Sequence, residues 1–294
     1  MPPEKAPWTV LDVIQWTARY FTSRQVESPR LSAELLLAHA LGLDRLDLYL
    51  DFARPLEQEE RATMRGLVKR RAAGEPVAYI TGEKGFWESS FEVTPAVLVP
   101  RPDTETLVES ALAELSGRSA DGLTVWEPAT GSGAVVLSLA AAEPDVRFLA
   151  SDRCPAALAV ARRNAARHHL LDRVAFFAAD WFAGLRPGGM AVDLIVVNPP
   201  YVAAAEIENL APEIRNHEPR QALDGGHDGL AHVRHIIDQA ADFLGSGGLL
   251  LMEIGWDQRA AVTDLGAASG RYAAVDFIRD LAGHDRVVRL AKKS

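Results

Sequence analysis

The sequence predicts an α/β protein in which a small α-helical bundle and a β-hairpin precede a doubly wound parallel sheet. Three observations support this fold class. The first 80 residues show helical periodicity without strand patterns, and the next twenty alternate apolar and polar residues. From Leu123 onward, short apolar runs alternate with helical segments, which is typical of a parallel sheet covered by helices on both faces.

Apolar residues at helical spacing define the start of the bundle. Residues 10–21 form the first predicted helix, and Thr9 and Asp12 are spaced like an N-terminal capping pair. Ser28-Pro29 starts a second helix, because proline suits the first helical turn. Gly42 can end that helix.

The rest of this region is also read from local signals. Residues 44–50 form a short amphipathic helix, and a further helix opens at Pro55 and runs to Gly74. We expect Lys69-Arg70-Arg71, near the end of that helix, to be a solvated cluster that complements the helix dipole. Residues 77–100 suit a hairpin between two domains, and residues 103–115 are helical again.

The C-terminal part consists of alternating strands and helices. We expect strands at 123–127, 146–150, 174–178, 192–197 and 249–254, helices at 134–142, 155–168 and 230–244, and a glycine turn at 245–248.

In an open α/β sheet, ligands bind beyond the carboxyl ends of the strands, and four predicted strand ends here carry suitable residues. After the first strand, Gly131 and Gly133 let the backbone turn sharply and approach a ligand. Asp152 ends the next strand, where its carboxylate can accept hydrogen bonds from both ribose hydroxyls. A dinucleotide site would also need a third glycine near Val136, which is missing. An adenosine ligand without pyrophosphate, such as S-adenosylmethionine, fits better than NAD, although a purely structural glycine turn is the alternative.

Asp180-Trp181 follows the third strand of this part. The carboxylate can accept from an adenine amino group, and the indole can stack on the adenine ring. An ordinary turn residue is the alternative interpretation of this aspartate.

The strongest local signal is Asn198-Pro199-Pro200-Tyr201, directly after an apolar strand. Two prolines remove two backbone donors and stiffen the chain, which leaves carbonyl oxygens as acceptors. The Asn198 side chain and the Pro199 carbonyl can accept both hydrogens of a planar NH₂ group, while Tyr201 stacks on the face of that group. A structural proline turn with an asparagine cap is the alternative.

Composition excludes several classes of protein. The net charge of −9 argues against a protein that grips nucleic acid through many phosphate contacts. Cys154 is the single cysteine, so no intramolecular disulfide forms and a reducing compartment is expected. The N-terminus has no apolar segment typical of a targeting signal, and we expect a cytoplasmic protein.

With these motifs in place, the chain resembles the release-factor glutamine methyltransferases, the HemK/PrmC family, over nearly its whole length. NPPY alone is not specific, because amino-methyltransferases acting on DNA adenine share it. The matching motifs are Tyr79-Ile80-Thr81-Gly82, Leu98-Val99-Pro100-Arg101-Pro102-Asp103-Thr104-Glu105, the NPPY run, Glu218-Pro219-Arg220, Ala222-Leu223-Asp224-Gly225-Gly226, Asp228-Gly229-Leu230, Glu253-Ile254-Gly255, Asp280-Leu281-Ala282-Gly283 and Asp285-Arg286.

The resemblance implies a Rossmann-like, S-adenosylmethionine-dependent methyltransferase domain at residues 103–294, a substrate-recognising helical bundle at 1–80 and a hairpin linker at 81–102. The implied reaction transfers a methyl group from S-adenosylmethionine to N5 of the glutamine in the Gly-Gly-Gln motif of class-1 peptide chain release factors. A related branch methylates a ribosomal protein, and the run from Arg101 to Glu105 favours the release-factor branch. The expected partner is therefore a release factor, with no direct nucleic-acid or membrane partner, and the protein is expected to be a monomer without a metal.

The same resemblance implies the site residues. The catalytic residues are Asn198, Pro199 and Tyr201, and the substrate-binding residues are Arg101, Asn198, Pro199, Pro200 and Tyr201. The cofactor-binding residues are Glu127, Ala129, Thr130, Gly131, Ser132, Gly133, Asp152, Asp180, Trp181 and Asn198.

The first cofactor motif departs from the family pattern of Asp-x-Gly-x-Gly-x-Gly. Glu127 replaces the aspartate and Ala129 the first glycine. If this position needs a positive φ, alanine costs about 1 kcal/mol or more, which can weaken cofactor affinity. Two other hypotheses stay open: an adenine N6-methyltransferase acting on nucleic acid, and an inactive protein that binds cofactor and release factor.

Overall fold

The computed structural model describes residues 8–116, 122–189 and 191–294, and it divides the chain into two compact units. The first unit runs to Glu83 and takes in Ala211–His217. The second comprises Lys84–Leu210 and Glu218–Ser294. No helix in the part described is both long and apolar enough to cross a membrane.

The first unit is helical, as predicted. Its α1 begins with the expected capping box, because the Thr9 hydroxyl accepts the Asp12 N–H at 3.2 Å and the Asp12 carboxylate accepts the Thr9 N–H at 3.0 Å. Gly42, with φ +64°, ends α2 as expected. The helices are α1 Val10–Ser23, α2 Pro29–Leu41, α3 Arg45–Leu50, α4 Gln58–Ala72, α5 Val77–Thr81 and α9 Pro212–His217.

Two predictions for α4 were wrong. The helix begins at Gln58 rather than Pro55, because the Glu60 carboxylate accepts the Glu57 N–H and fixes the start there. Arg71 is not solvated. It is buried, donates to the Glu75 carbonyl at 3.1 Å and forms an ion pair with Glu213 of α9.

The predicted hairpin is shorter than its sequence pattern suggested. Residues 77–81 form α5 instead of extended chain, because Pro76 pre-organises the start of the helix and Gly82, with φ +79°, ends it. The hairpin itself consists of β1 Glu83–Phe86 and β2 Ser89–Glu92.

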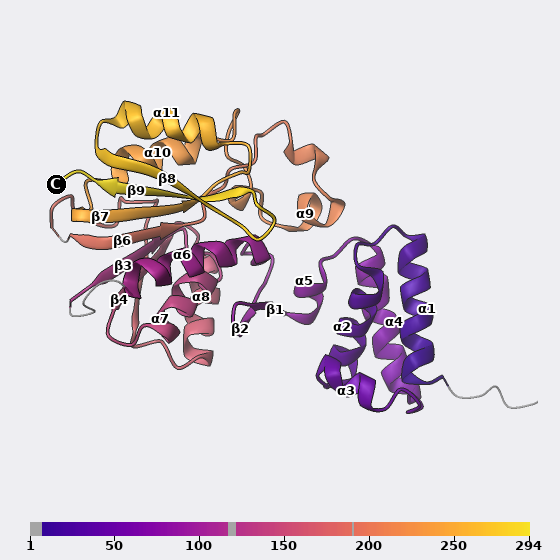
Figure 1. Ribbon diagram of the computed structural model, residues 1–294. Helices are drawn as coiled ribbons and strands as arrows, with labels where there is room; N and C mark the ends of the chain where they lie inside the picture. Colours follow the sequence, from indigo (N-terminus) through magenta and orange to yellow (C-terminus); the bar gives the residue numbers. More distant parts are fainter. Residues whose placement is uncertain (1–7, 117–121, 190) are drawn as a thin grey trace, which may run out of the picture. The chain divides into compact units, whose positions relative to one another are not determined.

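The second unit contains a seven-stranded sheet with strand order β5-β4-β3-β6-β7-β9-β8 (Figure 1). The five strands predicted from the sequence are parallel. The other two, β8 and β9, follow residue 254, where no strand was predicted, and β9 runs antiparallel to both of its neighbours. The strands are β3 Thr124–Pro128, β4 Arg147–Asp152, β5 Val174–Ala178, β6 Val192–Val197, β7 Leu244–Glu253, β8 Tyr272–Arg279 and β9 Asp285–Lys292.

The glycine run 245–248 was wrongly predicted as a turn. It lies within β7, where pairing with β6 shifts from Val192↔Leu244 to Leu194↔Leu249. The extra residues on β7 form a bulge, and glycine accommodates the positive φ of +69° at Gly247.

Helices cover both faces of the sheet, with α6, α7 and α8 on one face and α10 and α11 on the other (Figure 1). Successive residues of one strand enter opposite cores: Val125 packs with α6 and α7, whereas its neighbour Trp126 packs with α10. Because both faces are buried at the centre of the sheet, β6 and β7 carry apolar runs at residues 194–197 and 249–252. The α-helices are α6 Glu105–Ser116, α7 Ala134–Ala142, α8 Pro155–Arg167, α10 Ala231–Ala240 and α11 Arg259–Ser269, with 3₁₀ turns at Pro102–Thr104, Ile207–Asn209 and Arg220–Ala222.

Candidate active site

A cleft of about 980 Å³, including the solvent at its mouth, lies at the carboxyl ends of β3, β4, β5 and β6. The cleft brings together most of the residues predicted for the site: Arg101, Glu127, Ala129, Thr130, Gly131, Ser132, Asp152, Asp180, Trp181, Asn198 and Pro200.

Three predicted residues do not line the cleft. Gly133 caps α7 with φ +81°, and a Cβ there would lie 3.1 Å from Leu137 and 3.2 Å from Ala161. Glycine therefore allows α7 and α8 to pack closely at this point. Pro199 is buried within its loop, and Tyr201 points its hydroxyl at Glu253.

The turn after β3 has the shape that close approach to a ligand requires. Ala129, Gly131 and Gly133 all have positive φ, with Ala129 at +59°. Positive φ is strained for alanine, so the departure from the family motif sits on a position that favours glycine. The Thr130 N–H donates to the Ser151 carbonyl at 2.9 Å, which ties the turn to β4.

Glu127, at the end of β3, fixes the turn through two hydrogen bonds. It is buried, and its Oε2 accepts the Thr130 hydroxyl at 2.5 Å and the Val136 N–H at 3.2 Å. Burial raises the pKa of this carboxyl to about 8, although both hydrogen bonds favour the charged form. Glu127 thus joins the turn to the first turn of α7.

Asp152 closes the turn from β4. Its Oδ2 accepts the Gly131 N–H at 2.9 Å and its Oδ1 accepts the Cys154 N–H at 2.8 Å. Burial raises the pKa of this carboxyl against these two hydrogen bonds. Each oxygen keeps a second lone pair that can accept a ribose hydroxyl in the cleft.

Trp181 and Asp180 stand at the end of β5. Trp181 has φ +53°, a strained value that orients its indole. The indole packs against His232, with ring centroids 5.1 Å apart, and both residues line the cleft. Asp180 is exposed beside it and can accept a hydrogen bond from an adenine amino group.

Asn198 follows β6 and faces the same cleft. Its Nδ2 donates to the Thr104 hydroxyl at 3.1 Å. Three residues further on, the Tyr201 hydroxyl donates to Glu253 Oε1 at 3.1 Å. Burial, followed by the nearby Glu253 charge, raises the pKa of Tyr201, so its phenol stays protonated at neutral pH.

Arg101 reaches the cleft from the segment before α6. Its guanidinium donates to Glu218 Oε1 at 2.5 Å, and Glu218 Oε2 accepts the Val99 N–H at 3.2 Å. Glu218 is buried, so it fixes both the backbone and the side chain of this segment.

Sequence reasoning assigned no role to three residues that shape the site. Buried Asn164 of α8 donates to the Ser132 carbonyl at 2.9 Å and to the Glu92 carbonyl at 3.0 Å, and so joins the glycine turn to the hairpin. Thr104 and Glu253 contact Asn198 and Tyr201, as described above. Asn164 could have been found as a polar residue on the otherwise apolar face of α8. Thr104 and Glu253 lie within motifs that were already recognised in the sequence.

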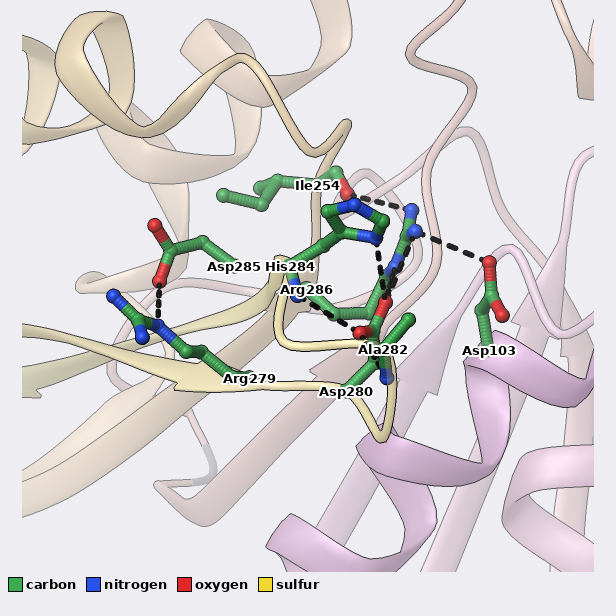
Figure 2. A network of polar contacts seen from close by, with 8 residues as sticks. All are labelled: Asp103, Ile254, Arg279, Asp280, Ala282, His284, Asp285 and Arg286. Carbon is green, nitrogen blue, oxygen red and sulfur yellow. Dashed lines mark hydrogen bonds and ion pairs between the residues drawn. The ribbon is translucent and has the colours of Figure 1, made fainter.

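A buried arginine anchors the segment that carries Thr104. Figure 2 shows the Arg286 guanidinium between Asp280 of the β8–β9 turn and Asp103, at 3.2 and 3.1 Å. The same guanidinium donates to the Ile254 carbonyl at 3.4 Å. Arg286 thereby ties Asp103 to the end of β7, which carries Glu253.

The donor set fits S-adenosylmethionine. A buried carboxylate at the end of β4 suits the ribose hydroxyls, a backbone turn of positive φ allows close approach, and an indole beside an aspartate suits adenine. Asn198 and Pro200 of the NPPY loop, which follows β6, line the same cleft. Their oxygen atoms suit a substrate whose amide or amino group receives the methyl group.

Comparisons with known proteins show which family the chain resembles. The PrmC N-terminal domain family matches residues 12–82, and the methyltransferase small domain family matches residues 104–228. The release factor glutamine methyltransferase of Geobacter sulfurreducens is 43% identical over 281 residues, which cover 96% of each chain. The protein of the same name from Moorella thermoacetica is 42% identical over 278 residues, covering 95% of this chain and 96% of that one.

Among solved structures, a methyltransferase from Pyrococcus furiosus aligns with a TM-score of 0.52 at 17% identity, over 79% of this chain and 100% of that one. At this identity the likeness concerns the fold alone. The near full-length identity to the two bacterial enzymes is far higher. The chain therefore belongs to the release factor glutamine methyltransferase family and is an S-adenosylmethionine-dependent protein-glutamine methyltransferase.

Proposed function

We propose that this enzyme methylates N5 of the glutamine in the Gly-Gly-Gln motif of class-1 peptide chain release factors. The observation that supports an amide as the methylated group is the placement of Asn198, held by Thr104, on the wall of the cleft that also contains Asp152. The names of the curated relatives support release factors as the substrate class.

The cofactor is held by the residues at three strand ends. Asp152 accepts the ribose hydroxyls, the turn from Ala129 to Ser132 lies against the methionine part, and Asp180 with Trp181 receives the adenine. When bound, S-adenosylmethionine supplies the electrophilic methyl group of its sulfonium.

The substrate amide is oriented by acceptors of the NPPY loop. An amide nitrogen is a poor nucleophile, because its lone pair is delocalised into the carbonyl. Asn198 Oδ1 and the Pro199 carbonyl each accept a hydrogen bond from one N–H of the amide. These two hydrogen bonds direct the nitrogen toward the methyl group and stabilise the positive charge that develops on it. Tyr201, fixed through Glu253, flanks the plane of the amide. The new N–C bond would form as the methyl–sulfur bond breaks, with S-adenosylhomocysteine as the leaving group. The nitrogen becomes acidic only as that bond forms and would then lose its proton to water, so no strong base is needed.

The helical unit recognises the body of the release factor, since a Gly-Gly-Gln loop is too short to define one protein. Its short helix α3 supports this role, because Leu46 and Leu50 are 72% and 84% exposed. Apolar side chains exposed side by side are typical of protein-binding surfaces.

Mass spectrometry of a release factor incubated with the enzyme and S-adenosylmethionine tests the proposal. One added methyl group on the Gly-Gly-Gln glutamine is the expected result. Methylation of another glutamine, or of adenine in added DNA, would replace the substrate. Binding of the release factor without any methyl transfer would support the inactive alternative.

A further inference from the structure

Asparagine can present either end of its amide to a ligand, because the oxygen and the NH₂ group have nearly the same shape. The proposed function needs the oxygen of Asn198 to face the substrate. A neighbour must therefore distinguish the two ends. The only side-chain hydrogen bond that the structure gives Asn198 within the described ranges runs from Nδ2 to the Thr104 hydroxyl, at 3.1 Å.

Thr104 alone cannot make this distinction. A hydroxyl accepts as well as donates, so it could pair with either end of the amide. What settles the direction is the place to which the hydroxyl gives its own proton. Thr104 is buried, and its hydroxyl favours the charged form of the Glu253 carboxyl, which lowers the pKa of that group.

Glu253 is a buried hydrogen-bond acceptor, and one of its two carboxylate oxygens has no partner among the described residues. Its side chain is 1% exposed, and Oε1 accepts the Tyr201 hydroxyl at 3.1 Å. Oε2 is buried and, within the described part of the chain, has no hydrogen-bond partner. An ionised carboxylate has no proton to give, so a hydroxyl that pairs with this oxygen must donate to it.

We infer that Glu253 and Thr104 are positioning residues that fix the polarity of the Asn198 amide. The Thr104 hydroxyl donates to the Glu253 carboxylate and is therefore left to accept from Asn198 Nδ2. That leaves Oδ1 of Asn198 directed at the cleft. This inference rests on the proposed function, because it takes Asn198 as the residue that holds the substrate amide.

The inference makes the arrangement dependent on pH. Protonated Glu253 can donate to Thr104, which removes the constraint on Asn198. Burial raises the pKa of Glu253 to about 7, against the hydrogen bonds from Thr104 and Tyr201 and the charge of Arg286. Asp103 raises it as well, and Arg286 is shared with Asp103 and Asp280. Turnover should accordingly fall as the pH drops below about 7.

The test measures kcat, KM and cofactor Kd for Thr104→Val, Thr104→Ser and Glu253→Gln. The pH is varied from 5.5 to 9, which extends about 1.5 to 2 units on either side of the expected inflection. We expect Thr104→Val to lower kcat by about ten- to a hundredfold with unchanged cofactor Kd, and Thr104→Ser to restore most of it. Glu253→Gln should lower kcat similarly and abolish the loss of activity at acid pH. Thr263→Val, which removes an exposed hydroxyl from α11, is the matched control and should behave as wild type.

A readout independent of activity uses side-chain ¹⁵N labelling of asparagine. The Asn198 amide signal, assigned by its absence in Asn198→Asp, should shift with a midpoint near pH 7 in the wild type and not in Glu253→Gln. The spectrum is simple because the chain contains only Asn164, Asn198, Asn209 and Asn216.

The outcomes separate the inference from the proposed function. If Asn198→Ala loses turnover but Thr104→Val and Glu253→Gln keep wild-type kcat and pH profile, the inference fails and the proposed function stands. If the wild type methylates no release factor, the proposed function fails and the amide signal still decides the inference. A signal that does not respond to Glu253→Gln would overturn it.

Discussion

The carboxylate of Asp152 accepts the main-chain N–H of Gly131 at 2.9 Å. The acidic end of β4 is thereby bonded to the glycine turn after β3. Each element thus fixes the other before any ligand binds, and the free energy of cofactor binding is not spent on ordering the turn. This makes the conformation of that turn, including the alanine within it, a direct determinant of affinity.

Replacing Ala129 with glycine should relieve strain in the turn. Alanine at φ +59° destabilises the folded protein by about 1–2 kcal/mol. Relief of this strain is partly offset, by about 0.4–1 kcal/mol, because glycine has more conformational freedom in the unfolded chain. We expect Ala129→Gly to raise the free energy of unfolding by about 0.5 kcal/mol and not to weaken cofactor binding. Urea unfolding and calorimetry measure the two quantities.

The control for this substitution is Ala159→Gly, at an exposed position in the middle of α8. There the same change should destabilise the protein by about 1 kcal/mol, because glycine is unfavourable inside a helix. Equal destabilisation by both substitutions would show that the turn does not strain Ala129.

Asn198→Ala should separate catalysis from cofactor binding. Asn198 accepts one N–H of the substrate amide in the proposed mechanism, whereas Asp152 and the glycine turn hold the cofactor. We expect kcat to fall by about a hundredfold or more and cofactor Kd to change by less than about threefold. Single-turnover methylation and calorimetry provide the measurement, and a variant with near wild-type turnover would remove Asn198 from the mechanism.

Glu127→Gln should make stability less dependent on pH. The folded-state pKa of about 8 lies above the ordinary glutamate pKa of 4.5, so the folded protein holds this proton where the unfolded chain has lost it. The contribution of Glu127 is complete below about pH 4.5 and is lost as the pH rises to about 8, by at most about 1.4 kcal/mol per pH unit.

The measurement is the free energy of unfolding of both proteins from pH 5 to pH 9. This range covers most of the interval, about pH 4.5 to 8, in which the contribution of Glu127 to stability should change. Wild type should lose stability relative to Glu127→Gln as the pH rises. Glu59→Gln, at an exposed position in the first turn of α4, controls for the charge change. A constant difference across the range would show that Glu127 is ionised in the folded protein throughout.

The exposed leucines of α3 should matter for the protein substrate alone. We expect Leu46→Glu combined with Leu50→Glu to raise KM for the release factor by about tenfold, since charges replace apolar contacts, with no effect on cofactor Kd. Leu171→Glu, at an exposed leucine of the second unit, is the matched control. An unchanged KM would assign recognition to another surface.

Local signals predicted much of this molecule. The cap at Thr9, the stop at Gly42 and the parallel strands up to β7 all follow from residues close together in the sequence, and the structure confirms them. The strand-end rule also brought Asp152, Trp181 and Asn198 to one cleft, because parallel strands present their carboxyl ends at one edge.

The remaining features depend on contacts between distant residues. Gly247 carries the signal of a turn, but pairing with β6 turns that run into a bulge. Arg71 is typical of a solvated helix end, but Glu213, far along the chain, buries it. Thr104 and Glu253 lie within recognisable motifs, but their roles depend on a network that only the folded sheet assembles.

The helical unit is discontinuous, since α9 belongs to it although it is encoded after most of the sheet. During synthesis, Arg71 emerges from the ribosome more than a hundred residues before its partner Glu213. Until translation has passed β6 and the NPPY loop, the nascent bundle lacks the carboxylate that neutralises its buried arginine. The helical unit and the NPPY loop are therefore completed together at a late stage of folding, and a chain truncated before α9 should be degraded by proteases more readily than the full chain.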